Sequence, residues 1–397
     1  MEKIAKDFYI LRLNDVNTKF FEAIWRIPEG ITYNAYVLTT DEGAILFDTW
    51  KHIYAKDFIE NLRRIIDPKD INYLVIHHMK QDHSGAVPIL LAENRNRAKV
   101  LGHKLVKTML KAFYGIEPKF KAVKDGEELV IGNKKIIFIH TPWLHWPETI
   151  MSYVQYGSTR ILLSGDAFGG FSIPPIIADE NDEVVLKYLN FVKKYIVTIV
   201  GFYSKFILKN IEKIKSQGIN PRIIAPAHGL IFKNKPELII NYYIKLAKGV
   251  AEKGKIVVIY SSMYGSVERA INVIVEELEK KGFKPIIYSF TDVNRSDIGE
   301  IISDIIDSEI VVIGASAYEG EIFPYMAFLL DIIARKVKSK KKFFVISSYG
   351  WGKTVSLKIS EKLVQAGHEV VEKIEFHGQP TNRDFEKIKQ SINLNIR

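Results

Sequence analysis

The sequence predicts an α/β protein in which a mixed α/β sandwich is followed by a doubly wound parallel sheet. Up to about residue 250, short apolar strands bounded by Gly, Asp and Asn are separated by helices. From Lys255 onward, buried strands alternate strictly with helices. The length of 397 residues also exceeds what one core comfortably holds, which indicates more than one domain.

The first part of the chain contains six runs with the composition of β-strands. They span residues 34–40, 43–49, 73–78, 135–141, 160–166 and 222–228. Helices are expected at 54–66 and 104–113, and a long amphipathic region covers 182–216. Turn residues at the strand ends, with helices between strands, predict a sandwich of mixed sheets.

The second part reads as a repeated strand–helix pattern. Strands are expected at 255–262, 285–290, 309–316, 341–348 and 370–378, with helices at 266–282, 296–307, 325–337 and 354–367 and a last helix after them. Apolar strands that alternate with helices favour a parallel sheet covered on both faces. We place the junction near residues 251–257, with domains at 1–252 and 253–397.

Composition excludes several kinds of chemistry. The chain has no Cys, which rules out disulfides, thiolate metal sites and a cysteine nucleophile, so any metal is held by His, Asp or Glu. No run reaches the roughly 18 apolar residues of a membrane span and no signal peptide is present, so we expect a cytoplasmic protein without membrane contact. The net charge of +10 is spread along the chain. It favours anionic partners, whereas no nucleic-acid module is present.

Histidines and aspartates gather at the ends of predicted strands. His78 ends the strand at 73–78 and Asp82 and His83 follow it, Asp166 ends the strand at 160–166, and His228 ends the strand at 222–228. His145 lies in the segment after 135–141. Imidazole and carboxylate are ligands for Fe, Mn or Zn, and Asp166 could bridge two cations. A single His at such a place is more often a buried structural residue, and D-H-S-G could be a capped turn. The set of four placements favours a metal site.

Three loops at the carboxyl ends of the second-part strands predict a mononucleotide site. The segment 261–266 (SSMYGS) leads from a strand into a helix, so its hydroxyls and amides would cradle a phosphate at the helix N-terminus. Neither the triphosphate-loop nor the dinucleotide glycine pattern is present. Tyr318 and Trp351, in the other two loops, offer flat faces to a ring. The alternative is a Ser-capped helix with ordinary aromatic packing.

These motifs together resemble the flavodiiron proteins, also called A-type flavoproteins. H-x-K-x-D-H at 78–83, TYNAYVL, TPWLHWPE, SGDAFG and APAHG resemble the metal half of that family, and SMYGS, GASAYEGEIFP and SYGWG resemble its flavin half. The resemblance covers essentially the whole chain. Within the family, the chain resembles the coenzyme F-420-dependent oxidases of methanogens. It implies a metallo-β-lactamase-like αββα sandwich followed by a flavodoxin-like domain.

The resemblance also implies site residues and cofactors. Non-haem iron, two ions in the family, would be held by His78, Asp82, His83, His145, Asp166 and His228, with Asp166, His228 and His145 at the reacting centre. FMN would be bound by residues of the three loops: Ser261, Ser262, Met263, Tyr264, Gly265, Ser266, Ala315, Ser316, Ala317, Tyr318, Glu319, Ser348, Tyr349, Gly350, Trp351 and Gly352.

One residue departs from the family pattern. Lys80 stands where the family has a Glu ligand, and an ammonium group repels a cation and has no lone pair to donate. Three outcomes follow. Lys80 swings away and water completes a weakened two-metal site, or one metal is lost, or Lys80 pairs with Asp82 or Asp166 and replaces the metals. Glu148 or Gln81 could supply an oxygen instead, and we expect His77 to be structural.

The implied activity is reduction of dioxygen to water, or of nitric oxide, with electrons that enter at FMN. The expected partners are a second copy in a head-to-tail homodimer, which two such dimers could extend to a tetramer, and a separate reduced donor. That donor would be coenzyme F-420 or a rubredoxin-like carrier, both anionic. The alternative is an FMN electron-transfer flavoprotein whose metal site is degenerate because of Lys80. Tyr195, Phe202 and Tyr203 would wall the oxygen pocket or pack in the core.

Overall fold

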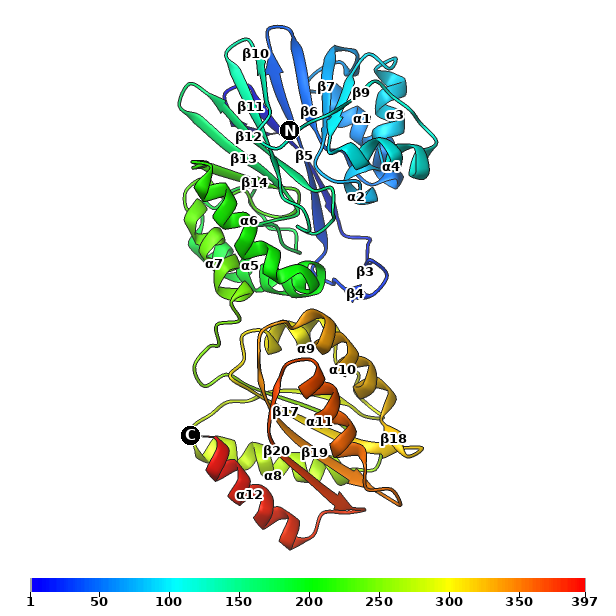
Figure 1. The fold of residues 1–397 in the computed structure, drawn as a ribbon, viewed down its shortest axis with the longest axis vertical. Helices are drawn as coiled ribbons and strands as arrows, with labels where there is room; N and C mark the ends of the chain where they lie inside the picture. The colour runs from blue at the N-terminus through cyan, green and yellow to red at the C-terminus, as the bar shows by residue number, and fades with distance from the viewer. Residues whose placement is uncertain (1, 397) are drawn as a thin grey trace. The chain divides into compact units, whose positions relative to one another are not determined.

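A computed structural model describes residues 2–396 and groups them into two compact units (Figure 1). The first unit extends to Tyr195 and includes Lys205–Ile244, and the second contains Ile196–Ser204 and the chain from Lys245 onward. The break along the chain thus falls close to the predicted junction, but a short inner segment is grouped with the second unit. The boundary at residue 252 stays a prediction.

The first unit is built on two sheets, as the sequence predicts. One has the strand order β1-β2-β5-β6-β7-β8-β9 and the other β10-β11-β12-β13-β14. The strands of the first sheet are β1 (Glu2–Ala5), β2 (Phe8–Asp15), β5 (Ile31–Thr40), β6 (Gly43–Phe47), β7 (Ile71–Ile76), β8 (Lys99–Gly102) and β9 (Phe120–Ala122). Those of the second are β10 (Glu128–Ile131), β11 (Lys134–His140), β12 (Ile150–Tyr156), β13 (Thr159–Gly165) and β14 (Ile223–Pro226). A small hairpin, β3 (Phe20–Phe21) and β4 (Trp25–Arg26), stands apart from both.

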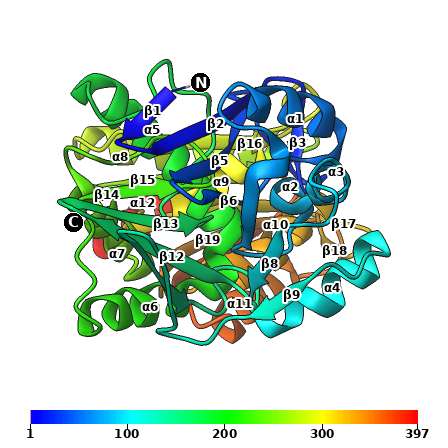
Figure 2. The ribbon, with the colours of Figure 1, turned by 90° about the horizontal axis from the view of Figure 1, so that it is seen from above.

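The core of this unit lies between the two sheets. Phe47 and Val75 of the first sheet belong to the same buried cluster as Phe138, Val154 and Leu163 of the second. Alternate side chains of each strand point to this layer, because successive residues of a strand face opposite sides. Figure 2 shows β2, β5 and β6 side by side, which agrees with their antiparallel pairing. Their shared burial holds the strand ends, and the loops after them, at fixed positions.

Helices cover the outer faces of the sandwich. They are α1 (Ala55–Arg63), α2 (Gln81–Ser84), α3 (Val87–Glu93), α4 (Lys104–Tyr114), α5 (Asp182–Tyr195), α6 (Ser204–Ser216) and α7 (Pro236–Ala247), with short 3-10 turns at His52–Tyr54 and Pro68–Asp70. The predicted helix at 54–66 is thus shorter than expected. The region 182–216 is interrupted by a π-turn at Ile196–Val200 and a 3-10 turn at Gly201–Tyr203. Among residues 2–396, no helix is long and apolar enough to cross a membrane.

The second unit is the predicted doubly wound sheet. Its strand order is β16-β15-β17-β19-β20, and all neighbours on this path are parallel. The strands are β15 (Ile256–Ser261), β16 (Ile286–Phe290), β17 (Ile310–Tyr318), β19 (Lys342–Tyr349) and β20 (Glu369–His377), and a short β18 (Glu321–Ile322) pairs antiparallel with β17. The order reverses at β15, so the loops after β15 and β17 flank a crevice at the switch point.

Helices cover both faces of this sheet (Figure 1). The helices are α8 (Ser266–Lys280), α9 (Ile298–Ile305), α10 (Pro324–Lys336), α11 (Val355–Gln365) and α12 (Asn382–Asn395). Ile271 of α8 and Ile388 of α12 share one buried cluster with Val258 and Val312 of the strands. The half-buried carboxylate of Glu375 accepts hydrogen bonds from the amides of Val355 and Ser356, 3.0 and 3.2 Å long, which fixes the start of α11.

His368 makes the stability of the second unit depend on pH. Its side chain is 5% exposed, its Nδ1 accepts a 3.4 Å hydrogen bond from the Lys341 amide, and its Nε2 has no hydrogen-bond partner. Burial, followed by the charges of Lys341 and Lys338, lowers the pKa of His368 to about 4. An unfolded His titrates near ~6.5, so the stabilisation is complete above that pH and is lost as the pH falls through the folded value.

We therefore expect the replacement His368→Phe to remove part of the acid sensitivity. As the pH falls from about 6.5 to 4, hydrogen exchange of β19 and β20, corrected for intrinsic rates, should accelerate more in the wild type than in His368→Phe. Replacement of the exposed His52 by Gln serves as the control and should leave the profile unchanged. Parallel profiles for the wild type and His368→Phe would refute this role of the imidazole.

Candidate functional site

The predicted metal ligands lie together in the first unit, on loops that follow four strands. His78 follows β7, and Asp82 and His83 lie on α2 directly after it. His145 lies between β11 and β12. Asp166 follows β13 and His228 follows β14, a parallel pair within one sheet. The cluster therefore joins the edges of both sheets of the sandwich.

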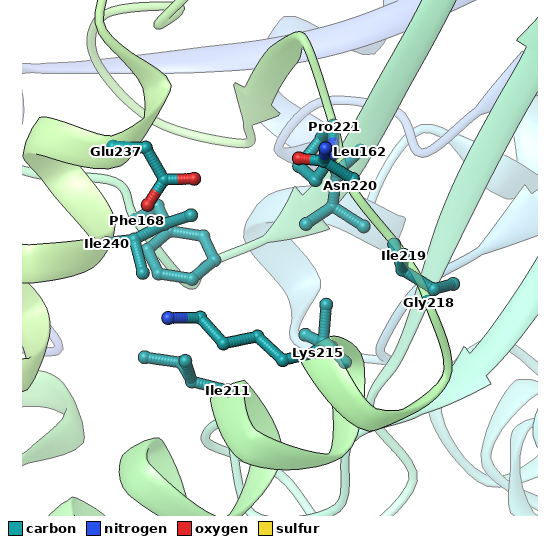
Figure 3. Close-up of a pocket in the computed structure, with 11 residues that line it drawn as sticks. Leu162, Phe168, Ile211, Lys215, Gly218, Ile219, Asn220, Pro221, Glu237 and Ile240 are labelled. Carbon is teal, nitrogen blue, oxygen red and sulfur yellow. The ribbon is translucent and has the colours of Figure 1, made fainter.

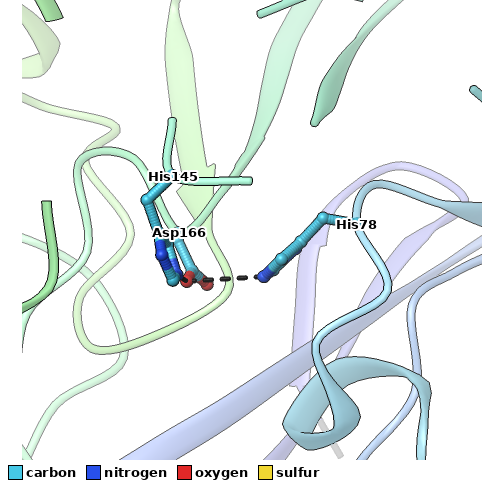
Figure 4. A group of neighbouring side chains, drawn as sticks. All are labelled: His78, His145 and Asp166. Carbon is cyan, nitrogen blue, oxygen red and sulfur yellow. Dashed lines mark hydrogen bonds and ion pairs between the residues drawn. The ribbon is translucent and has the colours of Figure 1, made fainter. Parts of the chain in front are cut away.

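The carboxylate of Asp166 stands between two groups of histidines. In the first donor group (His78, His145 and Asp166), Asp166 Oδ2 lies 2.8 Å from His145 Nε2 and 3.5 Å from His78 Nε2 (Figure 4). Its other oxygen, Oδ1, lies 2.9 Å from His83 Nε2 and 3.3 Å from His228 Nε2. Each oxygen thus serves a different set of imidazoles, which is the arrangement of a carboxylate that bridges two cations.

The second donor group contains Asp82, His83 and His228. Asp82 Oδ2 lies 3.5 Å from His83 Nε2 and 3.7 Å from His228 Nε2, and the two Nε2 atoms are 3.1 Å apart. His228 Nδ1 donates to the carbonyl of Thr32 at 2.7 Å, so we assign the lone pair of the neutral ring to Nε2. Two ring nitrogens this close need a proton or a cation between them.

Unpaired buried atoms show that these residues fit a metal. Among the described residues, several buried atoms of the cluster lack a conventional hydrogen-bond partner. They are both ring nitrogens of His78, both carboxylate oxygens of Asp82 and Oδ1 of Asp166. Buried polar atoms without partners are rare and point to a missing ion or water. The two donor groups, with Asp166 of the first group also facing the imidazoles of the second, therefore suit two divalent cations of the Fe, Mn or Zn class.

The electrostatics of the cluster favour ionised carboxylates. Burial would raise the pKa of Asp166, but His78, His83 and the hydrogen bond from His145 together hold this pKa well below its usual range. The pKa of Asp82 is raised by burial and lowered more strongly by His83 and Lys80, so the net shift is downward. Both side chains therefore remain anionic at neutral pH, as metal ligands must be.

Lys80 lies at the open side of the cluster and forms ion pairs with three carboxylates. Its Nζ is 3.1 Å from Glu22 Oε1, 3.6 Å from Asp82 Oδ2 and 4.0 Å from Asp166 Oδ2. The ammonium also lies over the ring of Phe21, 4.1 Å from its centroid. Burial lowers the pKa of Lys80, but Asp82, Asp166 and Glu22 outweigh burial and raise it overall. The group is therefore a cation, and its partner Glu22 was not expected from the sequence.

Glu22 and Phe21 reach Lys80 from the β3–β4 hairpin. Glu22 and the next residue, Ala23, have φ of 51° and 60°, a left-handed turn that few non-glycine residues adopt. The turn directs a carboxylate and an aromatic face to the same ammonium. No local pattern in the sequence signals this contact, because Glu22 and Lys80 are far apart along the chain and their side chains meet only after the hairpin folds.

The other candidates near the cluster have structural contacts. His77 Nδ1 is 2.5 Å from Asp48 Oδ2 and its Nε2 is 3.0 Å from Ser152 Oγ, so it takes no part in either donor group, as expected. Glu148 Oε1 accepts a 2.9 Å hydrogen bond from the Met79 amide and also lies outside both groups. Gln81 is exposed at the entrance.

Aromatic rings surround the second donor group. The rings of Tyr33 and Tyr195 lie 5.6 and 5.5 Å from the His228 ring, and Phe21 lies 6.1 Å away. Burial, with the nearby Asp166 carboxylate, raises the pKa of Tyr195 well above its usual range. Tyr195 thus lies against the cluster, whereas the rings of Phe202 and Tyr203 meet edge to face in the segment grouped with the second unit.

A cavity of about 460 Å³ leads to this cluster. Its lining includes Asp82 and Lys80 of the cluster, Trp146, whose ring lies 6.2 Å from that of His78, and the exposed rings of Phe20 and Phe113. The entrance is therefore aromatic, and its inner end carries the Lys80 cation and the Asp82 anion. A small molecule can reach the donor groups by this route, past the ammonium of Lys80.

The predicted flavin loops surround a cavity of about 400 Å³ in the second unit. Of the predicted residues, Ser262, Met263, Tyr264, Ser266, Ser316, Ala317, Tyr318, Glu319, Ser348, Tyr349, Gly350 and Trp351 line it, and Val267 and Gly378 are additional. Ser261, Gly265, Ala315 and Gly352 lie behind or beside this lining. Gly378 follows β20, a fourth strand end that the sequence interpretation overlooked.

This cavity has the features of a phosphate and ring site. The loop 262–265 precedes α8, whose N-terminal amides attract an anion, and the buried hydroxyls of Ser261 and Ser316 have no hydrogen-bond partner. Tyr264 and Trp351 are 87% and 85% exposed, so their large aromatic faces are available to stack on a bound ring. The residues fit a flat mononucleotide such as FMN, whose ring would stack on the aromatic side chains.

Comparisons with known proteins agree with both halves. The ODP family β-lactamase model matches residues 31–229, and a flavodoxin model matches residues 258–391. The rubredoxin-oxygen oxidoreductase of Megalodesulfovibrio gigas is 30% identical over 98% of this chain and 95% of its own length. The nitric oxide reductase of Moorella thermoacetica is 29% identical over 93% of this chain and 90% of its own length. A flavo di-iron protein from Thermotoga maritima has a similar structure, with a TM-score of 0.93, 40% identity and coverage of 99% and 96%.

Gly265 and Gly282 allow a matched test of the mononucleotide site. Both have a left-handed φ, 83° and 85°, and at both an added Cβ meets nothing within 4 Å. Alanine at either position should cost a similar ~1 kcal/mol of stability through backbone strain. Only Gly265→Ala distorts the phosphate loop, so we expect its FMN dissociation constant to rise about tenfold while Gly282→Ala binds FMN normally. Fluorescence titration of the apoprotein measures this, and equal affinities would exclude the loop as the phosphate site.

Proposed function

We propose a function for this chain, which belongs to the flavodiiron protein family. It is an oxidoreductase that reduces dioxygen or nitric oxide with electrons from a separate reduced carrier. Its cofactors are FMN and non-haem iron: bound FMN exchanges one or two electrons, and bound iron reduces the diatomic substrate. The observation that supports the proposal most is the shared carboxylate of Asp166, whose two oxygens serve two donor groups in the same chain as a flavin cradle.

The residues of this chain have separate tasks in that function. Asp166 holds the two donor groups together, and His145 and His228 present ring nitrogens to the same centre. Thr32 fixes the tautomer of His228 through its carbonyl. Phe21, Tyr33 and Tyr195 exclude water from one side of the centre, which strengthens every electrostatic interaction there.

The position of Lys80 favours one alternative function, that of an FMN electron-transfer flavoprotein, which is tested beside the main proposal. Its ammonium lies within 4.0 Å of two carboxylates of the candidate centre, a place where family members would have a ligand oxygen. If the ion pairs persist, the centre holds fewer metal ions and the protein acts as an FMN electron-transfer flavoprotein. The pair with Glu22 supports the main proposal, because it draws the ammonium toward the hairpin and away from Asp166.

Metal content decides between the two functions. Purified chain, reconstituted anaerobically with Fe(II) and FMN, should contain about two irons per FMN and consume dioxygen or nitric oxide when the flavin is photoreduced, which makes the unknown donor unnecessary. Lys80→Glu should raise iron affinity about tenfold or more. Lys80→Met, which removes the charge without adding a ligand, should have a smaller effect. A wild type without iron, combined with an active Lys80→Glu variant, would establish the electron-carrier alternative.

Two partners complete the proposal, a second copy of this chain and an anionic electron donor. In a head-to-tail homodimer, the flavin of one copy would face the metal centre of the other, and the exposed faces of Tyr264 and Trp351 would be covered. The net charge of +10 favours an anionic donor such as coenzyme F-420 or a rubredoxin-like carrier.

Subunit mixing tests the head-to-tail arrangement. A dimer of Asp166→Asn, which lacks the bridging oxygen pair, and a dimer of Gly265→Ala from which the weakly bound FMN has been removed by dialysis should each be inactive. Co-expressed, they should form mixed dimers in which one flavin faces one intact metal centre, and part of the activity should return. An absence of recovery in mixed dimers verified by mass spectrometry would show that electrons stay within one copy.

A further inference from the structure

The cavity that holds Lys80 and Glu22 leads to the donor groups, whereas the apolar recess in Figure 3 lies at the opposite end of β14 from them. That recess opens to solvent past the exposed side chains of Lys215 and Glu237, near the start of β14. His228 follows the other end of the same strand. Lys80 and Glu22 both line the cavity of about 460 Å³ that reaches the cluster, so their charges act on any metal ion that enters it.

Three carboxylates compete for the Lys80 ammonium. Glu22 Oε1 is the nearest, 3.1 Å from Nζ, and the donor oxygens of Asp82 and Asp166 lie at 3.6 and 4.0 Å. Of the three, only Glu22 lies outside both donor groups. A divalent cation held by Asp82 or Asp166 would repel the ammonium, so the pair with Glu22 is the one that can persist beside a metal. Without Glu22, the remaining partners of the ammonium would be ligands that the metal needs.

Phe21 anchors the β3–β4 hairpin at the place where this pair can form. Its side chain is 4% exposed, and its ring lies 5.5 Å from the ring of Phe171 and 6.1 Å from that of His228. The same ring lies 4.1 Å from Lys80 Nζ. The next residue, Glu22, is 35% exposed in its side chain. The buried ring thus fixes the hairpin against the second donor group, and the hairpin presents a carboxylate at the rim of the cavity.

We propose that Glu22 is a positioning residue for the metal centre, which holds the Lys80 ammonium outside the donor groups and so lets metal ions bind despite a cation at position 80. This inference rests on the proposed function for the presence of metal, and it names a residue outside the ligand set that controls metal affinity. Coupling between two equilibria is reciprocal, so a bound metal ion favours the Glu22–Lys80 pair as much as the pair favours the metal. Metal binding should therefore also tighten the hairpin.

A double-mutant cycle with Mn(II) tests this role in the FMN-loaded, metal-depleted protein. Mn(II) binds most weakly in its series, which keeps affinities measurable, and the EPR signal of the free ion reports binding without turnover. Glu22→Gln should weaken Mn(II) binding about fivefold in the chain with Lys80 and less than twofold in Lys80→Met. Arg26→Gln removes an exposed charge from β4 of the same hairpin and is the matched control, which should bind Mn(II) as the wild type does.

The background with Lys80→Met separates positioning from a merely structural role. Equal losses of affinity in both backgrounds would show that Glu22 supports the fold or the metal directly, and would overturn the proposal, as would an unchanged affinity in Glu22→Gln. Mn(II) binding by Lys80→Met but not by the wild type would overturn it as well, because Glu22 would then fail to hold the ammonium away. If neither binds Mn(II), the metal centre of the proposed function is refuted, and the inference falls with it.

Hydrogen exchange of the hairpin provides the reciprocal measurement. Addition of Mn(II) should slow the exchange of amides in residues 20–26 about threefold or more in the wild type, and clearly less in Glu22→Gln. Arg26→Gln should respond as the wild type does. A hairpin whose exchange does not change when the wild type binds Mn(II) would contradict the proposed coupling.

Discussion

The sharing of one buried carboxylate, that of Asp166, between two groups of imidazoles is the constraint on which the rest of the first unit depends. Asp166 is fully buried, and its oxygens face His83 and His228 on one side and His145 and His78 on the other. A buried anion without cationic partners would cost several kcal/mol. Both sheets must therefore place their strand ends within one hydrogen-bond length of the same carboxylate.

The sandwich core provides that precision. Side chains from both sheets interlock in one cluster, so β7 of one sheet and β13 and β14 of the other cannot shift independently. Outside the ligands, Thr32 orients His228, and the rings of Tyr33 and Tyr195 close the site. Lys80 adds a cation at the open side, which the β3–β4 hairpin balances with the carboxylate of Glu22 and the ring of Phe21. The charge balance of the centre thus involves a segment outside both sheets.

The second unit also places its binding residues on loops at strand ends, but these loops suit a flavin mononucleotide and not metal ions. Its loops carry hydroxyls, glycines and exposed rings and no cluster of charges, because a helix N-terminus already supplies partial positive charge for a phosphate. The flavin cavity is open where the metal cluster is buried. This difference suits the two cofactors, since a flavin ring exchanges electrons with a partner at a surface, whereas a metal centre benefits from exclusion of water.

The sequence by itself determined the elements, the two-part order and the chemistry of the strand-end residues, because periodicity, turn residues and donor types are local properties of the chain. The strict alternation after Lys255 correctly predicted the parallel sheet, and the histidine and aspartate loops converge as expected. Only the tertiary structure decided that Glu22 and Phe21 meet Lys80 and that Asp166 directs one oxygen toward His145 and His78 and the other toward His83 and His228. Those contacts join residues from different elements, so they arise from strand pairing and packing and leave no periodic trace in the sequence.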